Sequence, residues 1–252
     1  MNTKNDNAKG ILFILFGMAI FSIQDALIKF VYNDSSLYEL YFGRTFVAFV
    51  LLLTFMFLKK KKLILKTHYP FLTSLRVILF FFGFSFFYIA LTYMGLAMAN
   101  ALFFCCPFFM SIFAKIFLKE KIGIRRWSAI VVGFVGVFIV LNPDFNDFNI
   151  ANLAPVACAI CYAGSMIILK ITNDKDNVYS QMTHLYIGAL LISSIFFFLI
   201  GDGKFDNFSD PSMQFIFREW WTNPQKAWPI IIAMGFCGSL AFAFVFNAYN
   251  IA

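Results

Sequence analysis

The stretch ILFILFGMAIFSIQDALIKFVY, residues 11–32, decides the fold. Its 22 residues carry only two charged side chains, Asp25 and Lys29. A helix of this length rises about 33 Å, which is enough to cross the ~30 Å hydrocarbon core of a bilayer. A cleaved signal peptide has a shorter apolar region and a small-residue cleavage site. We therefore predict a retained membrane-spanning helix.

The rest of the chain repeats this pattern. Of its 252 residues, 61% are hydrophobic and 13% are charged, whereas soluble domains carry about 45–50% apolar and about 25% charged residues. The composition predicts an all-α, polytopic membrane bundle of about eight spans. We place them near residues 10–32, 36–58, 72–93, 95–117, 126–142, 151–170, 179–201 and 228–250. The segment 202–227 is long, and Trp220, Trp221 and Trp228 lie in it or next to it. Tryptophans favour a membrane interface, so we predict a short helix on the membrane surface there.

The basic residues orient these spans. With the N-terminus inside, fourteen of the twenty Lys and Arg residues fall on cytoplasmic segments, and the short outer loops hold none. This asymmetry predicts a multi-pass protein with a cytoplasmic N-terminus. The lysine run at 59–62 is either a lipid-binding patch or, as we favour, a topology anchor. The net charge of +7 comes with no nucleic-acid-binding motif, so we expect no nucleic-acid partner.

Signatures of catalysis are missing from the sequence. It contains no G-x-S-x-G, H-E-x-x-H or Walker loop. Cys158 and Cys161 form a C-x-x-C, which is either a metal or redox motif or two small residues packing one turn apart. No second pair completes a tetrahedral site, so we favour packing. We predict a protein that is not an enzyme and has no metal and no cofactor.

Ionisable groups inside spans are costly, by about 2.5–3.5 kcal/mol each at a helix centre, and therefore mark candidate sites. Asp25 lies about 22 Å into the first span, and Arg44 lies about 12 Å into the second from the other side. We hypothesise that they pair, with Lys29 one turn beyond Asp25. The cluster either contacts substrate or a coupling proton, or is a static ion pair that locks two spans. Arg76 lies near the cytoplasmic end of its span, where an interface anchor is favoured over a site.

Uncharged polar residues deep in spans are the second group of candidates. Each either lines a cavity or bonds a neighbouring helix. Pro107 is expected to kink the fourth span, because proline lacks the N–H that a helix needs. These polar residues are Tyr88, Thr92, Asn100, Tyr162, Ser165, Gln181, Tyr186, Asn247 and Tyr249, of which Asn100 and Asn247 are favoured, and Gln24 precedes Asp25 in the first span.

Three stretches together resemble the EamA family of the drug/metabolite transporter (DMT) superfamily. The first is FSIQDALIK at 21–29, followed by Arg44, and the second is the aromatic and small-residue run 88–100. The third begins at Pro107, passes Leu118-Lys119-Glu120, where the family more commonly has Gly before Glu, and continues into a glycine-rich span ending at Asn142-Pro143. The Gln-Asp-x-x-x-Lys pattern in the first span is similar to that of bacterial metabolite carriers, including an S-adenosylmethionine importer group.

The resemblance implies ten helices arranged as two inverted five-helix repeats. Residues 11–142 would form the first repeat, and 151–252 would supply helices six to eight of a truncated second repeat, so about eight of ten helices are expected. It implies a secondary transporter that moves a small metabolite across the bacterial inner membrane by alternating access, driven by a coupled proton, by exchange or by the substrate gradient itself. The alternative is a non-transporting membrane scaffold or a lipid-modifying enzyme. The expected substrate-binding or coupling residues are Gln24, Asp25, Lys29, Arg44, Tyr88, Asn100, Tyr162 and Asn247.

Overall fold

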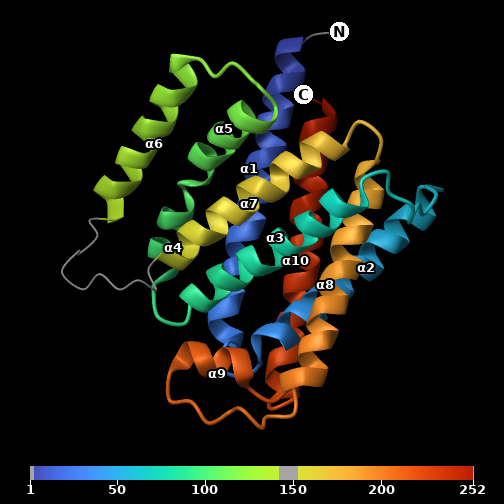
Figure 1. Ribbon diagram of the computed structural model, residues 1–252, viewed down its shortest axis with the longest axis vertical. Helices are drawn as coiled ribbons and strands as arrows, with labels where there is room; N and C mark the ends of the chain where they lie inside the picture. The colour runs from blue at the N-terminus through green and yellow to red at the C-terminus, as the bar shows by residue number, and fades with distance from the viewer. Residues whose placement is uncertain (1–2, 142–152, 252) are drawn as a thin grey trace. The chain divides into compact units, whose positions relative to one another are not determined.

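The computed structural model describes residues 3–141 and 153–251, and these ranges form helices joined by turns and loops, without a strand (Figure 1). Most helices begin and end near the predicted boundaries of the apolar runs. The helices are α1 (Thr3–Val31), α2 (Leu37–Leu58), α3 (Pro70–Ala90), α4 (Leu96–Phe103), α5 (Cys106–Phe117), α6 (Ile124–Leu141), α7 (Ala154–Thr172), α8 (Val178–Ile200), α9 (Pro211–Phe217) and α10 (Pro224–Ile251).

Seven membrane-length apolar helical stretches occur in the described part of the chain. The fourth of them, Leu96–Phe117, joins α4 to α5. A shorter apolar stretch, Trp127–Gly136, lies in α6, where the fifth span was expected. The predicted fold class, a polytopic all-helical membrane bundle, is confirmed.

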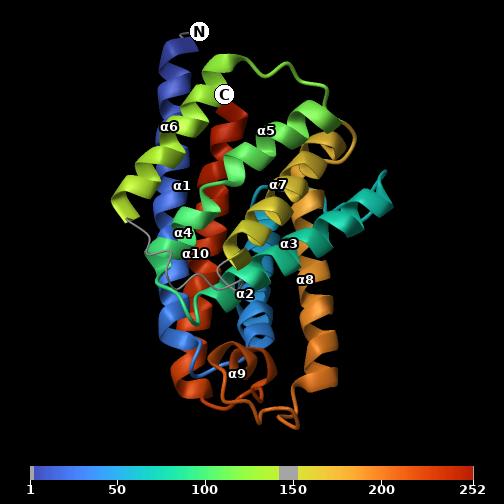
Figure 2. The ribbon, with the colours of Figure 1, turned by 60° about the vertical axis from the view of Figure 1, so that its left-hand side comes forward.

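The predicted break in the fourth span is also confirmed. Helix α4 ends at Phe103 and α5 begins at Cys106, with Pro107 in the first turn of α5 (Figure 2). At the junction, the Cys105 N–H donates to the Leu102 carbonyl at 3.3 Å, and the Phe108 N–H donates to the Cys105 carbonyl at 3.0 Å. These tighter bonds close the helix end where proline cannot donate.

The helices form two compact units. Unit 1 comprises Met1–Lys62, Leu190–Asn207 and Phe217–Ala252, and unit 2 comprises Leu63–Ala189 and Phe208–Ile216. Helix α8 supplies residues to both. The units follow spatial packing and do not follow the two halves of the sequence, so the assignment of repeats to 11–142 and 151–252 stays a prediction.

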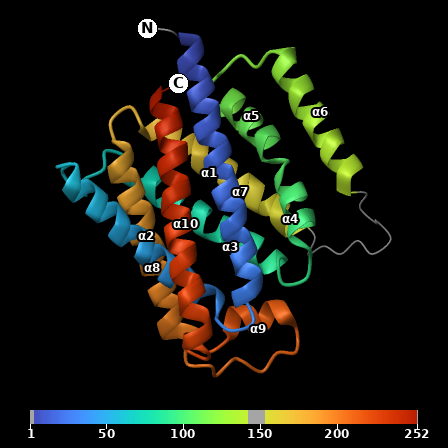
Figure 3. The same ribbon diagram turned by 180° about the vertical axis from the view of Figure 1, so that it is seen from behind.

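Glycines allow close helix packing inside unit 1. Helices α1 and α10 run side by side (Figure 3). Where α10 meets α2, a Cβ on Gly235 would lie 2.6 Å from the Val47 Cβ and 2.8 Å from the Arg44 carbonyl oxygen. Small residues at such crossings let helix backbones approach within a membrane, where lipid offers no hydrophobic drive.

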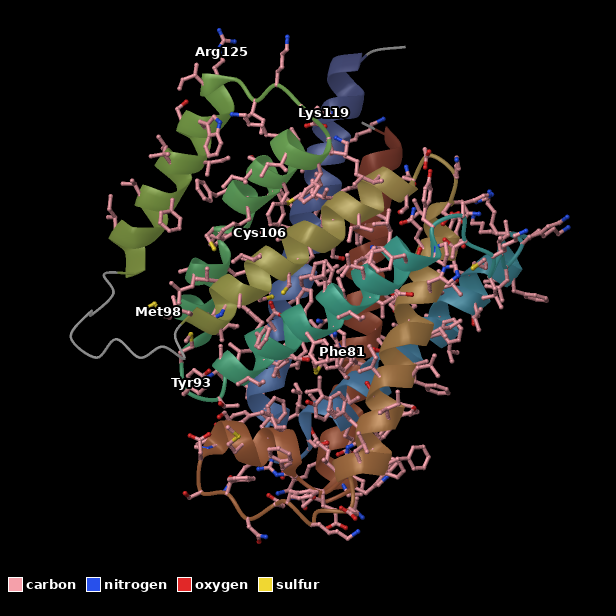
Figure 4. The ribbon with its side chains drawn as sticks, viewed as in Figure 1. Phe81, Tyr93, Met98, Cys106, Lys119 and Arg125 are labelled. Carbon is pink, nitrogen blue, oxygen red and sulfur yellow. The ribbon has the colours of Figure 1, made fainter. Side chains whose placement is uncertain are left out.

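In unit 2, α3 and α5 pack on α7. A Cβ on Gly83 of α3 would lie 2.8 Å from the Cβ of Cys161. Cys106, which lies on α5 (Figure 4), forms a buried core cluster with Ala159 and Ala163 of α7. Cys158 is fully buried. The C-x-x-C therefore lies in a packed helix interface, as the packing interpretation predicts.

The segment 202–227 contains the expected short helix, α9. One of its tryptophans does not behave as an interface residue, because Trp220 is buried. Its ring packs against Phe197 and Phe42 of unit 1, with centroids 4.8 and 5.8 Å away. Trp221 is exposed and stacks on Trp228 at 4.8 Å. The interface interpretation thus fits Trp221 better than Trp220.

Candidate functional site

Unit 1 contains the predicted charged residues. Asp25 of α1 and Arg44 of α2 are both half-buried and lie close enough to interact electrostatically. The Arg44 guanidinium also sits over the Tyr41 ring, 4.5 Å from its centroid. Lys29 follows Asp25 by one turn and is half-buried. Opposite charges on consecutive spans therefore share one neighbourhood, an arrangement that can hold a proton or a charged ligand.

Gln24 faces helix α10. Its side chain is buried, and a Cβ on Gly238 would lie 2.5 Å from its Oε1 atom. A glycine at 238 therefore makes the room that this amide occupies between α1 and α10. Asn247 lies in the last turns of α10, and its side chain lies outside the described residues.

In unit 2, the predicted residues Tyr88 and Tyr162 join an aromatic cluster. Tyr162 of α7 meets Phe84 of α3 edge-on at 5.9 Å and Phe103 of α4 at 5.7 Å. Tyr88 is fully buried, 6.1 Å from Phe84. Rings at these separations attract one another by about 0.5–1.5 kcal/mol per pair, and a flat aromatic ligand uses the same interaction. Asn100 of α4 is half-buried three residues before Phe103.

Arg76 is a buried residue and not an interface anchor, so that interpretation is wrong. Its side chain lies against helix α8, where Nη1 donates to both the backbone carbonyl and the Oε1 of Gln181, each at 3.3 Å. Gln181 is held in turn, because the Thr172 hydroxyl donates to its Oε1 at 3.1 Å and its Nε2 donates to the Asp176 carbonyl at 3.0 Å. The depth of Arg76 along the helix was readable from sequence, but the face on which it lies was not.

Two loops of unit 2 are joined by a group that we call the loop latch, formed by Thr67, His68 and Asp176. The Asp176 carboxylate accepts from the Thr67 hydroxyl, from the His68 N–H at 3.0 Å, and lies 2.9 Å from His68 Nδ1. Burial alone raises the pKa of Asp176, but the hydrogen bonds from Thr67 and His68 outweigh it and hold that pKa below its usual range.

Two further contacts join the same two segments that the loop latch connects. The Ser180 hydroxyl donates to the Ile64 carbonyl at 2.8 Å, and His184 Nε2 lies 2.8 Å from the Leu65 carbonyl oxygen. The segment before α3 is thus fastened to the start of α8 at several points. Nothing in the spacing of these residues predicted the junction, since its partners lie more than one hundred positions apart.

Glu39 is a further buried acid that the sequence analysis missed. Its side chain is 1% exposed at the start of α2, and Oε1 accepts from the Trp228 Nε1 at 3.0 Å. The Glu39 N–H donates to the Ser36 hydroxyl at 3.2 Å. Ser36 and Glu39 form the S-x-x-E spacing of a helix capping box, and this was the readable signal.

Comparison with known proteins matches residues 8–142 to the EamA-like transporter family. The chain is 29% identical to an S-adenosylmethionine uptake transporter of Rickettsia felis and 28% identical to one of Rickettsia prowazekii. Each alignment covers 96% of this chain and about three quarters of the relative. A riboflavin transporter of Vibrio cholerae is 30% identical over 60% of this chain and 45% of its own length.

Proposed function

Because the chain belongs to the EamA-like transporter family and is a small-metabolite transporter, we propose that it is a secondary carrier working by alternating access. We place it in a bacterial inner membrane with its N-terminus in the cytoplasm, which the basic-residue asymmetry supports. The proposed substrate is S-adenosylmethionine. The observation that carries this choice is coverage, because three relatives with that name align over 96% of the chain, whereas riboflavin transporters align over 49% to 75% of it.

Each unit, considered by itself, contains groups that suit a part of such a substrate. S-Adenosylmethionine has a flat purine ring, two positive groups and one carboxylate. In unit 1, the Asp25 carboxylate offers a counter-charge for a cation or a site for a coupling proton. In unit 2, the aromatic cluster around Tyr162 offers surfaces on which a purine can stack. The proposed binding and coupling residues are Gln24, Asp25, Lys29, Arg44, Tyr88, Asn100, Tyr162 and Asn247. The proposal assigns the chain no catalytic step and no cofactor.

Uptake by proteoliposomes tests the function. We expect labelled S-adenosylmethionine to accumulate and unlabelled S-adenosylmethionine to compete. Stronger competition by riboflavin would reassign the substrate, and the absence of uptake of either would refute a carrier of these metabolites. An imposed pH gradient that accelerates uptake would identify the proton as the coupling ion.

Cysteine labelling in intact cells tests the orientation. Lys61→Cys should be protected from an impermeant maleimide, because residue 61 lies in the basic segment placed in the cytoplasm. Asp206→Cys, in the long segment placed outside, should react. The opposite labelling pattern would overturn the proposed orientation.

A further inference from the structure

Arg76 is a buried cation within a membrane span. It lies six residues after Pro70, the start of α3, and therefore about 9 Å along the helix. Its side chain is only 5% exposed. Gln181 receives the Nη1 hydrogens, but Nε is buried and has no hydrogen-bond partner within the part of the chain that the structure describes.

The acids of unit 2 that form ion pairs are occupied elsewhere. Asp176 pairs with His68 and accepts from Thr67, and Glu120 pairs with Lys170. Asp176 is linked to Arg76 only indirectly, because its backbone carbonyl accepts a hydrogen bond from the Gln181 side-chain amide, which in turn accepts from Arg76. Within residues 3–141 and 153–251, the Arg76 charge therefore meets amide and carbonyl dipoles and has no carboxylate in an ion pair with it.

A buried guanidinium without a counter-ion lowers the stability of the folded protein unless a bound ligand neutralises its charge. Removing a charge from water without a counter-ion costs several kcal/mol, even in real proteins that relax around it. A charge within a membrane span faces the protein interior or a cavity and marks a substrate or ion path. Tyr162, a member of the aromatic cluster, lies close enough to Arg76 for an electrostatic interaction. The guanidinium and the rings therefore belong to one neighbourhood of unit 2.

We propose that Arg76 recognises an anionic oxygen group, a carboxylate or a phosphate, on the molecule that unit 2 binds. A guanidinium is planar and presents its N–H groups as a fork that fits two oxygens of an oxyanion. Gln181 fixes Nη1 and so orients the fork, leaving the Nε hydrogen for the ligand. The identity of the ligand as a transported metabolite rests on the proposed function, and the phosphate of an anionic lipid offers the same chemistry.

Paired ligands that differ only in the anion test the proposal. S-Adenosylmethionine is compared with its decarboxylated analogue, and riboflavin 5′-phosphate with riboflavin, by competition for uptake and by binding to the purified protein. We expect the wild type to prefer the member that carries the carboxylate or phosphate by about tenfold or more, as one charge-assisted hydrogen bond supplies. Arg76→Met should lose this preference while its affinity for the member without the anionic group stays within about twofold of the wild-type value.

Two further variants keep the test decisive if Arg76→Met does not fold. Gln181→Glu retains Arg76 but sets a carboxylate beside Nη1, so we expect it to occupy the guanidinium and abolish the preference. Arg76→Lys keeps the charge without the fork and should retain only part of it. Lys170→Met, a cation of the same unit in the Glu120 pair, is the matched control and should keep the full preference.

The outcomes separate this inference from the proposed function. A preference that persists in folded Arg76→Met or in Gln181→Glu, or a wild type without any preference, overturns the role of Arg76. If neither pair is carried or bound, the proposed function fails, and nanodiscs decide the inference. If the protein melts at a higher temperature in phosphatidylglycerol than in phosphatidylcholine nanodiscs, and Arg76→Met removes this difference, Arg76 binds the phosphate of an anionic lipid. Equal melting temperatures in the two lipids overturn it.

Discussion

Asp176→Ala should weaken unit 2 strongly, because this side chain holds the loop latch together. The carboxylate is 3% exposed and takes hydrogen bonds from the Thr67 hydroxyl and the His68 backbone, with the His68 ring at 2.9 Å. Hydrogen bonds to charged groups contribute about 1.5–3 kcal/mol each. In the variant, water can replace the hydrogen bond that the exposed His68 ring loses, which offsets part of this cost. We expect a loss of about 3 kcal/mol, or about 6–12 °C in melting temperature for a chain of this size.

The assay is thermal unfolding of the purified protein followed by tryptophan fluorescence, with Asp174→Ala as the control. Asp174 lies in the same loop but is exposed and accepts one hydrogen bond, from the Tyr69 hydroxyl at 3.0 Å. Its removal should cost less than about 1 kcal/mol. Equal shifts in the two variants would refute the reasoning that burial and multiple donors make Asp176 important.

The pH dependence of a second variant, Asp176→Asn, gives an independent check at the same residue. The pKa of Asp176 in the folded protein lies below its ordinary value of 3.8, since the hydrogen bonds of Thr67 and His68 outweigh the effect of burial. A lowered pKa contributes stability above the ordinary value, and this stability is lost as the pH falls through the folded value. The difference between wild type and Asp176→Asn should therefore narrow as the pH falls below about 3.8. A difference that vanishes by pH 5 would contradict this origin.

Three further perturbations follow from the structure. Asp25→Asn should reduce uptake in proteoliposomes at least tenfold or remove its pH dependence, and uptake with an unchanged pH profile would limit Asp25 to packing. Gly235→Ala should lower the melting temperature by the equivalent of about 1–3 kcal/mol, because the new Cβ overlaps α2. Gly133→Ala, which meets nothing within 4 Å, should be neutral or stabilising, and equal effects would refute the packing argument. Trp228→Phe should cost about 1–3 kcal/mol in thermal unfolding, since it removes the side-chain donor of the buried Glu39 carboxylate, whereas a cost below about 0.5 kcal/mol would show that the bond is dispensable.

The elements of the fold were predictable because lipid imposes a simple requirement on sequence. A span needs about 20 apolar residues whose backbone is satisfied within the helix, so length and hydropathy suffice to find it. The break at Pro107 was predictable for a similarly local reason, the missing N–H. The short helix α9 followed from the length of its segment and its flanking tryptophans. Each of these inferences needs only neighbours in sequence.

The buried polar contacts were harder to predict because they depend on partners far along the chain. Arg76 looked like an anchor, since its distance from the helix end fits one, and only the position of Gln181 shows that it points inward. Asp176 meets residues about 108 positions away. Glu39 carries a local capping signal, but its burial depends on Trp228, 189 positions later.

The contrast between Asp25 and Arg76 separates two uses of charge inside spans. Asp25 lies within electrostatic reach of Arg44, so a ligand or proton that binds there must compete with an existing internal attraction. Arg76 instead faces the dipoles of Gln181, which orient the guanidinium without neutralising it. An acid within reach of an opposite charge is suited to exchange partners during a transport cycle, whereas an oriented cation without an ion-pair partner is suited to select one kind of ligand. Substitution of Asp25 should therefore change how uptake depends on pH, and substitution of Arg76 should change which molecule is taken up.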